Sequence, residues 1–275
     1  MTTGHLPVPG ATLHYEVRGA GPALLISQSG EGDARRSTDL ADHLVDSYTV
    51  ITYDRRGLSR SALDRPRPVP LRQHADDVHH LLAALTDRPA AILGCSMGAA
   101  IGLHLALDHP GQIATLIAHE PVSPGLLPPA ERTRHLAELA GIQRLYRREG
   151  LTPALKAITE ALGIDPAAPD AEPGRTPHPM TPQRVADFGF FLEHDVTAVI
   201  GDTLPTGDLA STGARIVPAV GRTTPPAAFD RRCAQELAAL LGTEPAEFPG
   251  GHNGNLTHPR AFAARLKEVL SRRAG

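Results

Sequence analysis

A G-x-S-x-G motif at residues 94–98 constrains this chain more than any other feature of its sequence. The motif follows a short apolar run at residues 90–93 and precedes apolar residues at helical spacing over residues 97–109. A strand that turns sharply into a helix needs small residues on both sides of the turn, because the two backbones approach closely. The pattern predicts an α/β architecture with Ser96 exposed at the carboxyl end of a strand. An ordinary glycine-rich strand-to-helix turn is the alternative.

The rest of the chain repeats this alternation of strand and helix patterns. Strands that alternate with helices predict a mostly parallel sheet with right-handed crossovers, flanked by helices. The other expected strands cover residues 13–17, 23–27, 48–53, 113–118, 216–220 and 246–248. The expected helices cover residues 34–46, 71–87, 97–109, 129–149, 151–163, 182–198, 227–241 and 258–272.

The alternation breaks in the middle of the chain. Between Pro121 and about Thr206 no convincing strand pattern occurs, and helical stretches flank a loop rich in proline, which disfavours helix and sheet interiors. An insertion into an α/β core usually lies over one end of the sheet. We therefore predict a core formed by residues 1–121 and 207–275, with residues 122–206 as an inserted helical lid.

Composition excludes several classes of protein. A net charge of −3 argues against a dedicated nucleic-acid binder. The two cysteines form no disulfide framework and no metal-ligand pattern, and the usual nucleotide and zinc motifs do not occur. No apolar run is long enough to span a membrane, and no signal peptide is recognisable. We expect a cytoplasmic protein without metal or cofactor that acts on a small molecule; its oligomeric state stays open.

A serine nucleophile needs a base, and 14 histidines are available. His252 lies in a glycine-rich loop after the last predicted strand, at the sheet edge where the 94–98 motif ends. His258 competes with it, but the following Pro259 marks the start of the last helix. We predict that His252 is the base.

The base in turn needs a carboxylate to orient it. The loop after the strand at residues 216–220 contains none, and Asp230 falls within the next helix. Glu120 stands at the end of the strand at residues 113–118, 24 positions after Ser96. We predict Glu120 as the acid, with Asp230 next to be tested; the alternative is that Glu120 caps the hinge of the lid or pairs with an arginine.

Two backbone N–H groups are candidates to bind the oxyanion. The first residue of the helix after Ser96 is Met97, and a glycine-rich turn containing Gly30 follows the strand at residues 23–27. We predict Gly30 and Met97 as the donors. Strand alternation makes Cys95 and His119 structural residues that point away from the site.

These residues together resemble the α/β-hydrolase superfamily over essentially the whole chain. Within it, the chain is similar to the zearalenone lactonases, which open a fungal-toxin lactone. That likeness rests on six short segments. One of them, residues 221–229, lacks an acid at the position where most hydrolases of this superfamily carry it. The others are residues 30–32, 94–96, 119–120, 249–252 and 257–259. The family's triad of Ser, Glu after the sixth strand and His implies Ser96, Glu120 and His252 here.

The resemblance also concerns the lid. The lactonases place a lid tryptophan against the substrate, whereas this chain contains no tryptophan. The predicted lid has three phenylalanines, Phe188, Phe190 and Phe191, and helical spacing lets at most two of them face one pocket.

We therefore expect a serine hydrolase that cleaves a carboxylic ester or a lactone through an acyl-enzyme, including a zearalenone-type macrolactone. A C–C hydrolase or a perhydrolase could use the same triad. A ligand-binding protein on a hydrolase scaffold is an alternative of a different class.

Overall fold

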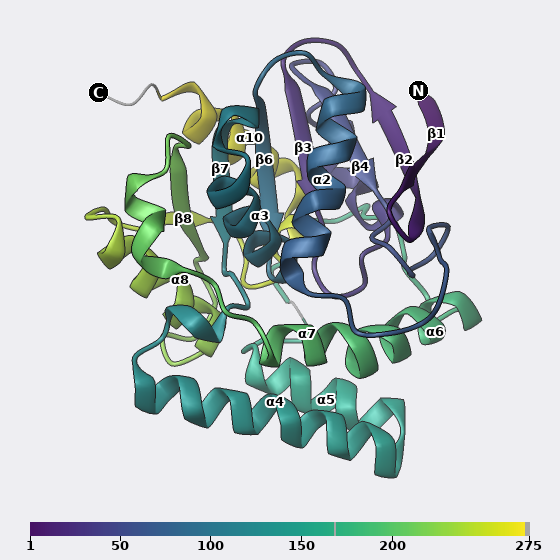
Figure 1. Cartoon of the computed structure of the whole chain (residues 1–275), viewed down its shortest axis with the longest axis vertical. Coiled ribbons are helices and arrows are strands. Elements are labelled where there is room, and N and C mark those ends of the chain that lie inside the picture. The colour runs from purple at the N-terminus through teal and green to yellow at the C-terminus, as the bar shows by residue number, and fades with distance from the viewer. Residues whose placement is uncertain (168, 273–275) are drawn as a thin grey trace.

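The computed structural model describes residues 1–167 and 169–272. Within these residues the chain forms one sheet of nine strands, in the order β1-β2-β4-β3-β6-β7-β8-β9, with β5 paired to β2 (Figure 1). The strands are β1 (Thr2–Val8), β2 (Ala11–Arg18), β3 (Ala23–Ser27), β4 (Thr49–Tyr53), β5 (Ala62–Leu63), β6 (Ala90–Cys95), β7 (Ile113–His119), β8 (Ile216–Gly221) and β9 (Ala246–Phe248).

The helices connect these strands and cover the sheet. They are α1 (Thr38–Asp42), α2 (Leu71–Leu85), α3 (Met97–Asp108), α4 (Pro129–Glu149), α5 (Leu151–Ala161), α6 (Pro182–Phe190), α7 (Val196–Ile200), α8 (Phe229–Leu240), α9 (Gly254–Thr257) and α10 (Pro259–Ser271). Strands β4, β3, β6, β7, β8 and β9 run parallel, and β1, β2 and β5 pair antiparallel. The predicted α/β fold with a mostly parallel sheet is confirmed.

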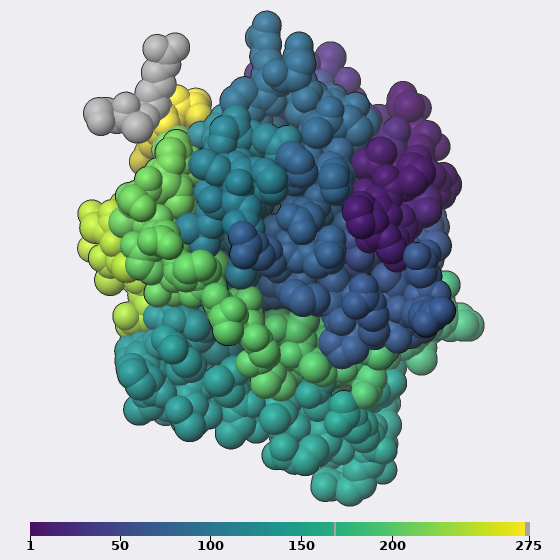
Figure 2. Space-filling view, viewed as in Figure 1, coloured from purple at the N-terminus to yellow at the C-terminus, as the bar shows by residue number. Residues whose placement is uncertain are grey.

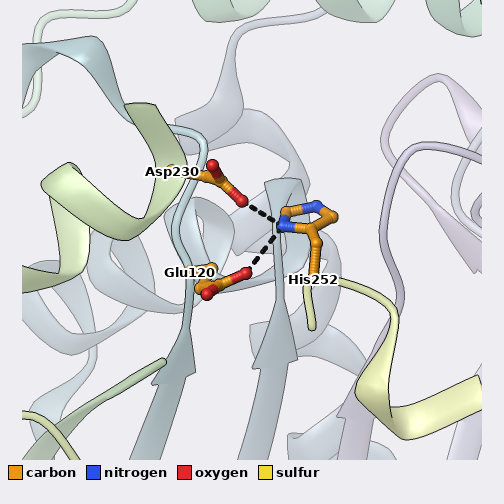
Figure 3. Close-up of side chains that lie close together, drawn as sticks. All are labelled: Glu120, Asp230 and His252. Carbon is orange, nitrogen blue, oxygen red and sulfur yellow. Dashed lines mark hydrogen bonds and ion pairs between the residues drawn. The ribbon is translucent and has the colours of Figure 1, made fainter. Parts of the chain in front are cut away.

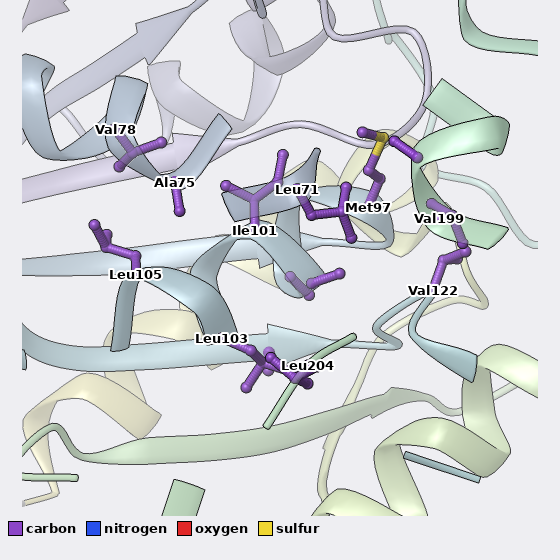
Figure 4. Packing of buried hydrophobic residues seen from close by; sticks show 14 of the residues in the cluster. Leu71, Ala75, Val78, Met97, Ile101, Leu103, Leu105, Val122, Val199 and Leu204 are labelled. Atoms are coloured by element: carbon purple, nitrogen blue, oxygen red, sulfur yellow. The ribbon is translucent and has the colours of Figure 1, made fainter. Parts of the chain in front are cut away.

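Buried apolar residues form a layer on each face of the sheet. Leu25 of β3 packs in the layer that contains α2 and α3, whereas its neighbours Leu24 and Ile26 pack in the layer that contains α1 and α10. This division follows from strand geometry, because successive side chains point to opposite faces. Figure 4 shows the first layer, where Val78 of α2 and Ile101 of α3 lie above the strands. Burial on both faces explains why the central strands are almost continuously apolar.

The segment between β7 and β8 contains helices α4, α5, α6 and α7 and no strand among its described residues. These helices lie together beyond one end of the sheet, and the space-filling view shows them in close contact with the rest of the molecule (Figures 1 and 2). The buried ion pair between Arg55 Nη2 and Asp195 Oδ2, at 2.6 Å, joins this segment to the loop after β4.

The structure differs from the predicted elements in several places, and two short elements, β5 and α9, were not predicted. Strand β1 was not predicted because Gly4 and Pro7 obscure its pattern; an edge strand tolerates both. The helix expected over residues 34–46 is only a short 3₁₀ turn followed by α1. The helix expected over residues 182–198 is interrupted by a π-helical turn at Phe191–Asp195, where the Gln143 amide donates to the Leu192 carbonyl at 2.8 Å.

None of the helices that the structure describes combines the length and the apolar character needed to cross a membrane.

Candidate active site

Ser96 occupies the turn between β6 and α3 with a strained backbone, at φ 57° and ψ −118°. The flanking glycines allow this turn. A Cβ added at Gly98 would lie 2.1 Å from the carbonyl oxygen of Ser27, and one at Gly94 would lie 2.6 Å from Cα of Ala99. A non-glycine residue in the left-handed region costs on the order of 1–3 kcal/mol and is typical of functional sites. The turn thus holds the Ser96 hydroxyl at the carboxyl end of β6.

Glu120 follows β7 directly and also has a positive φ, of 45°. Its backbone N–H donates to the carbonyl of Ala219 at 2.9 Å, and its Oε1 accepts the N–H of Gly221 at 2.8 Å. Both partners belong to β8, so the neighbouring strand fixes the orientation of the carboxylate. The other oxygen, Oε2, lies 3.0 Å from Nδ1 of His252.

His252 lies in the loop between β9 and α9 and is almost fully buried. Its Nδ1 contacts two carboxylates: Glu120 and Asp230 both point at this nitrogen (Figure 3). Its Nε2 is buried and has no hydrogen-bond partner among the described residues. A histidine held at Nδ1 by a carboxylate leaves Nε2 available as a base. Hydrogen bonds to the nucleophile are often long before substrate binds.

Asp230, in the first turn of α8, corrects one expectation from the sequence. Its position within a helix predicts that it lies too far along the chain to reach the catalytic histidine. In the structure, however, its buried carboxylate forms an ion pair with His252. The signal that could have found it is its place: it is the first carboxylate after β8, and the first turn of the next helix lies near that end of the strand.

The three buried groups change one another's affinity for protons. Burial favours the neutral form of Glu120, but the hydrogen bond with His252 and the nearby imidazoles outweigh it and lower the pKa of Glu120. For Asp230 burial dominates and raises the pKa. Burial would lower the pKa of His252, but the two carboxylates outweigh it and raise that pKa. Glu120 therefore keeps its charge more readily than Asp230 does.

Among the described residues, these three are also a group whose ligand atoms lie close enough together to hold a cation. One ligand atom from each of Glu120, Asp230 and His252 lies within 4.8 Å of the others. The contacts between the carboxylates and Nδ1 are, however, explained without a cation. At such distances the imidazole N–H donates its proton to the carboxylates.

A pocket of about 390 Å³ joins Ser96 to His252. Gly30 lies on its wall beside the ring of Phe191, and the Gly30 carbonyl accepts from Arg55 Nη2 at 2.8 Å. Met97 begins α3, so its N–H belongs to the first turn, whose N–H groups have no acceptor within the helix. The remaining wall is mainly apolar, with Leu155, Ile158, Leu162, Ile164, Pro166, Met180 and Phe188.

Four other side chains lie as the sequence predicted. Cys95 is buried within the apolar layer on the α1 and α10 side. His119 is buried between the rings of Phe248 and Phe262, and burial lowers its pKa to about 4. Two of the three phenylalanines, Phe188 and Phe191, line the Ser96 pocket.

The fold agrees with comparisons to known proteins. The sequence profile of the alpha/beta hydrolase fold matches residues 22–162. The uncharacterized hydrolase YraK of Bacillus subtilis (strain 168) is 34% identical over 277 residues, which covers 99% of this chain and 97% of YraK.

Solved structures show the same architecture. The enol-lactonase of Burkholderia xenovorans LB400 superposes with a TM-score of 0.75 at 20% identity, over 98% of this chain and 100% of that one. A thermophilic esterase from Thermogutta terrifontis gives a TM-score of 0.75 at 18% identity, over 98% of both chains. With the profile match and the full-length relative, these results show that the chain belongs to the alpha/beta hydrolase fold family.

Proposed function

We propose that this protein is a serine hydrolase of carboxylic esters or lactones. The observation that carries the proposal is that Ser96, on a strained strand-to-helix turn, shares one pocket with His252, whose Nδ1 is held by a carboxylate. The esterase and the enol-lactonase with the same fold support an ester or lactone bond as the target.

In the first half of the reaction, His252 Nε2 takes the proton from Ser96 as Oγ attacks the substrate carbonyl. The carbonyl π electrons move to oxygen, and the backbone N–H groups of Gly30 and Met97 donate to that oxyanion. When the tetrahedral intermediate collapses, the C–O bond to the alcohol breaks and the imidazolium returns the proton to the leaving oxygen. Glu120 stabilises the imidazolium throughout.

In the second half, water takes the place of the alcohol. His252 removes one proton from the water, its oxygen attacks the acyl carbon, and Ser96 leaves with the proton from His252. The acid is released and the enzyme returns to its starting state. A lactone follows the same steps, except that the alcohol and the acid stay in one molecule.

The helical segment at residues 122–206 acts in this proposal as a lid over the core of residues 1–121 and 207–275. Its helices α5 and α6 supply Leu155, Ile158 and Phe188 to the pocket wall, so they shape the acyl or alcohol site. A lactone of zearalenone type would occupy this apolar wall.

The proposal is tested with a panel of p-nitrophenyl esters, simple lactones and macrolactones, using the wild type and Ser96→Ala. We expect turnover of at least one ester or lactone and its loss by about 10⁴–10⁶-fold in the variant, with an unchanged circular dichroism spectrum. Turnover that survives in Ser96→Ala would refute the serine mechanism. Activity confined to C–C bonds or to peracid formation would replace the ester assignment.

A further inference from the structure

Three charged side chains interrupt the apolar wall of the Ser96 pocket: Glu31, Arg36 and Arg184. They come from the loop and 3₁₀ turn after β3 and from helix α6. In an apolar pocket, a few placed polar groups fix the orientation of a ligand. The balance of charge among these three therefore indicates what the pocket accepts.

Arg184 and Glu31 satisfy each other. Nε of Arg184 donates to Oε2 of Glu31 at 2.7 Å, and Nη2 donates to Oε1 at 2.9 Å. Nη1 of Arg184 donates to the carbonyl of His178, and the guanidinium lies 5.3 Å from the centre of the Phe188 ring. A bidentate pair of this kind is electrically neutral and geometrically fixed.

The positive charge of Arg36 is only partly neutralised, because no carboxylate of the described residues forms a close ion pair with it. Its closest carboxylate contact is Nε to Glu31 Oε2 at 3.4 Å, and that oxygen already accepts from Arg184. No other described residue accepts a hydrogen bond from its guanidinium, although its side chain is only 13% exposed. The nearby Asp33 is held by three hydrogen bonds from the Arg35 guanidinium. Burial lowers the pKa of Arg36, as expected for a poorly compensated cation.

The terminal N–H groups of Arg36 have no acceptor among the described residues and remain accessible from the pocket, so a ligand can supply the acceptor. The two Nη groups of Arg36 form a planar fork that fits a carboxylate. We infer that Arg36 binds a carboxylate of the substrate, so that the enzyme acts on esters or lactones that carry an anionic carboxylate besides the bond to be cleaved. The ester or lactone part of this inference rests on the proposed function; the binding of a carboxylate at Arg36 does not.

The test compares two p-nitrophenyl esters of equal length, the half-ester of adipic acid and the neutral hexanoate. We expect the wild type to prefer the anionic ester in kcat/KM, and Arg36→Gln to reduce this preference by about 10–100-fold. A second pair, p-carboxyphenyl and phenyl hexanoate, tests a carboxylate on the alcohol side. If Arg36→Gln alters the preference in neither pair, the inference is wrong.

Arg35→Gln is the matched control, because Arg35 is the neighbouring arginine but does not line the pocket; it should leave the preference unchanged. Arg36→Lys should retain part of the preference. If Arg36→Gln does not fold, Glu31→Gln replaces it: loss of this carboxylate frees both arginines and should strengthen the preference, and a weakened preference would contradict the inference.

A binding measurement separates this inference from the proposed function. Calorimetry should detect adipate binding to wild type and weaker binding to Arg36→Gln, whether or not any ester is hydrolysed. Absence of hydrolysis with this difference intact would reject only the proposed function, and equal binding by both proteins would reject the carboxylate site.

Discussion

The carboxylate of Asp230 forms an ion pair with Nδ1 of His252, the ring nitrogen that Glu120 also contacts. One imidazole N–H thus faces two buried acids that are 110 positions apart in the chain (Figure 3). The two acids are not equivalent, because Glu120 also accepts the Gly221 N–H, whereas no backbone N–H of a described residue donates to Asp230 beside its ion pair with His252.

The inequivalence predicts different effects of neutral substitutions. Glu120→Gln should lower kcat by about 10⁴, as loss of the charged acid does in other triads. Asp230→Asn should cost less, because the charge of Glu120, which the Gly221 N–H also stabilises, remains. Steady-state kinetics on one ester checks this order. A larger loss in Asp230→Asn would identify Asp230 as the principal acid.

Asp230→Asn should also move the pH profile. His252 must be neutral to accept the Ser96 proton, so kcat/KM rises with pH through the pKa of His252. Since the carboxylates raise that pKa, removal of one charge lowers it. The alkaline-rising limb should therefore move to lower pH, by about 1–3 pH units. A merely structural role for Asp230 would reduce the rate and leave the limb in place.

The serine turn should not tolerate a side chain at Gly98. An added Cβ would lie 2.1 Å from the Ser27 carbonyl oxygen, so Gly98→Ala must displace the turn. We expect a loss of about 1–3 kcal/mol in the free energy of unfolding and about 10²-fold in kcat. Gly111→Ala is the control, because an added Cβ there meets no atom within 4 Å. Equal stability and equal kcat in the two variants would argue against the close approach of Gly98 to the Ser27 carbonyl.

The buried pair of Arg55 and Asp195 should stabilise the junction between the helical segment and the core. Asp195→Asn leaves the buried Arg55 guanidinium without its carboxylate, at a cost of about 3–5 kcal/mol in urea unfolding. Asp108→Asn, which breaks an exposed pair with Arg72, should change the stability little. Comparable losses of unfolding free energy in both variants would show that burial of an ion pair does not determine how much it stabilises this protein.

Much of this architecture could be predicted from the sequence. Residues 90–98 predict β6 and the Ser96 turn, because glycine spacing and apolar runs are local signals. The central strands were predictable for the same reason. Strand β1 was missed because pairing with β2 along an edge overrides its weak local pattern.

The site was predictable only where it depends on strand ends. Glu120 directly follows β7 and His252 lies in the short loop after β9, so chain order brings them to one edge of the sheet. Asp230 and Arg36 reach the site through the orientation of a helix and of a 3₁₀ turn, which packing decides and sequence periodicity does not reveal.

The central claim is that Ser96 is a nucleophile activated by His252, and covalent labelling tests it most directly. The folded protein is treated with a fluorophosphonate and digested, and the modified peptide is identified by mass spectrometry. The account predicts one adduct per chain, on Ser96, with labelling greatly slowed in His252→Ala. A folded wild-type protein that remains unlabelled, or an adduct on another residue, would contradict it.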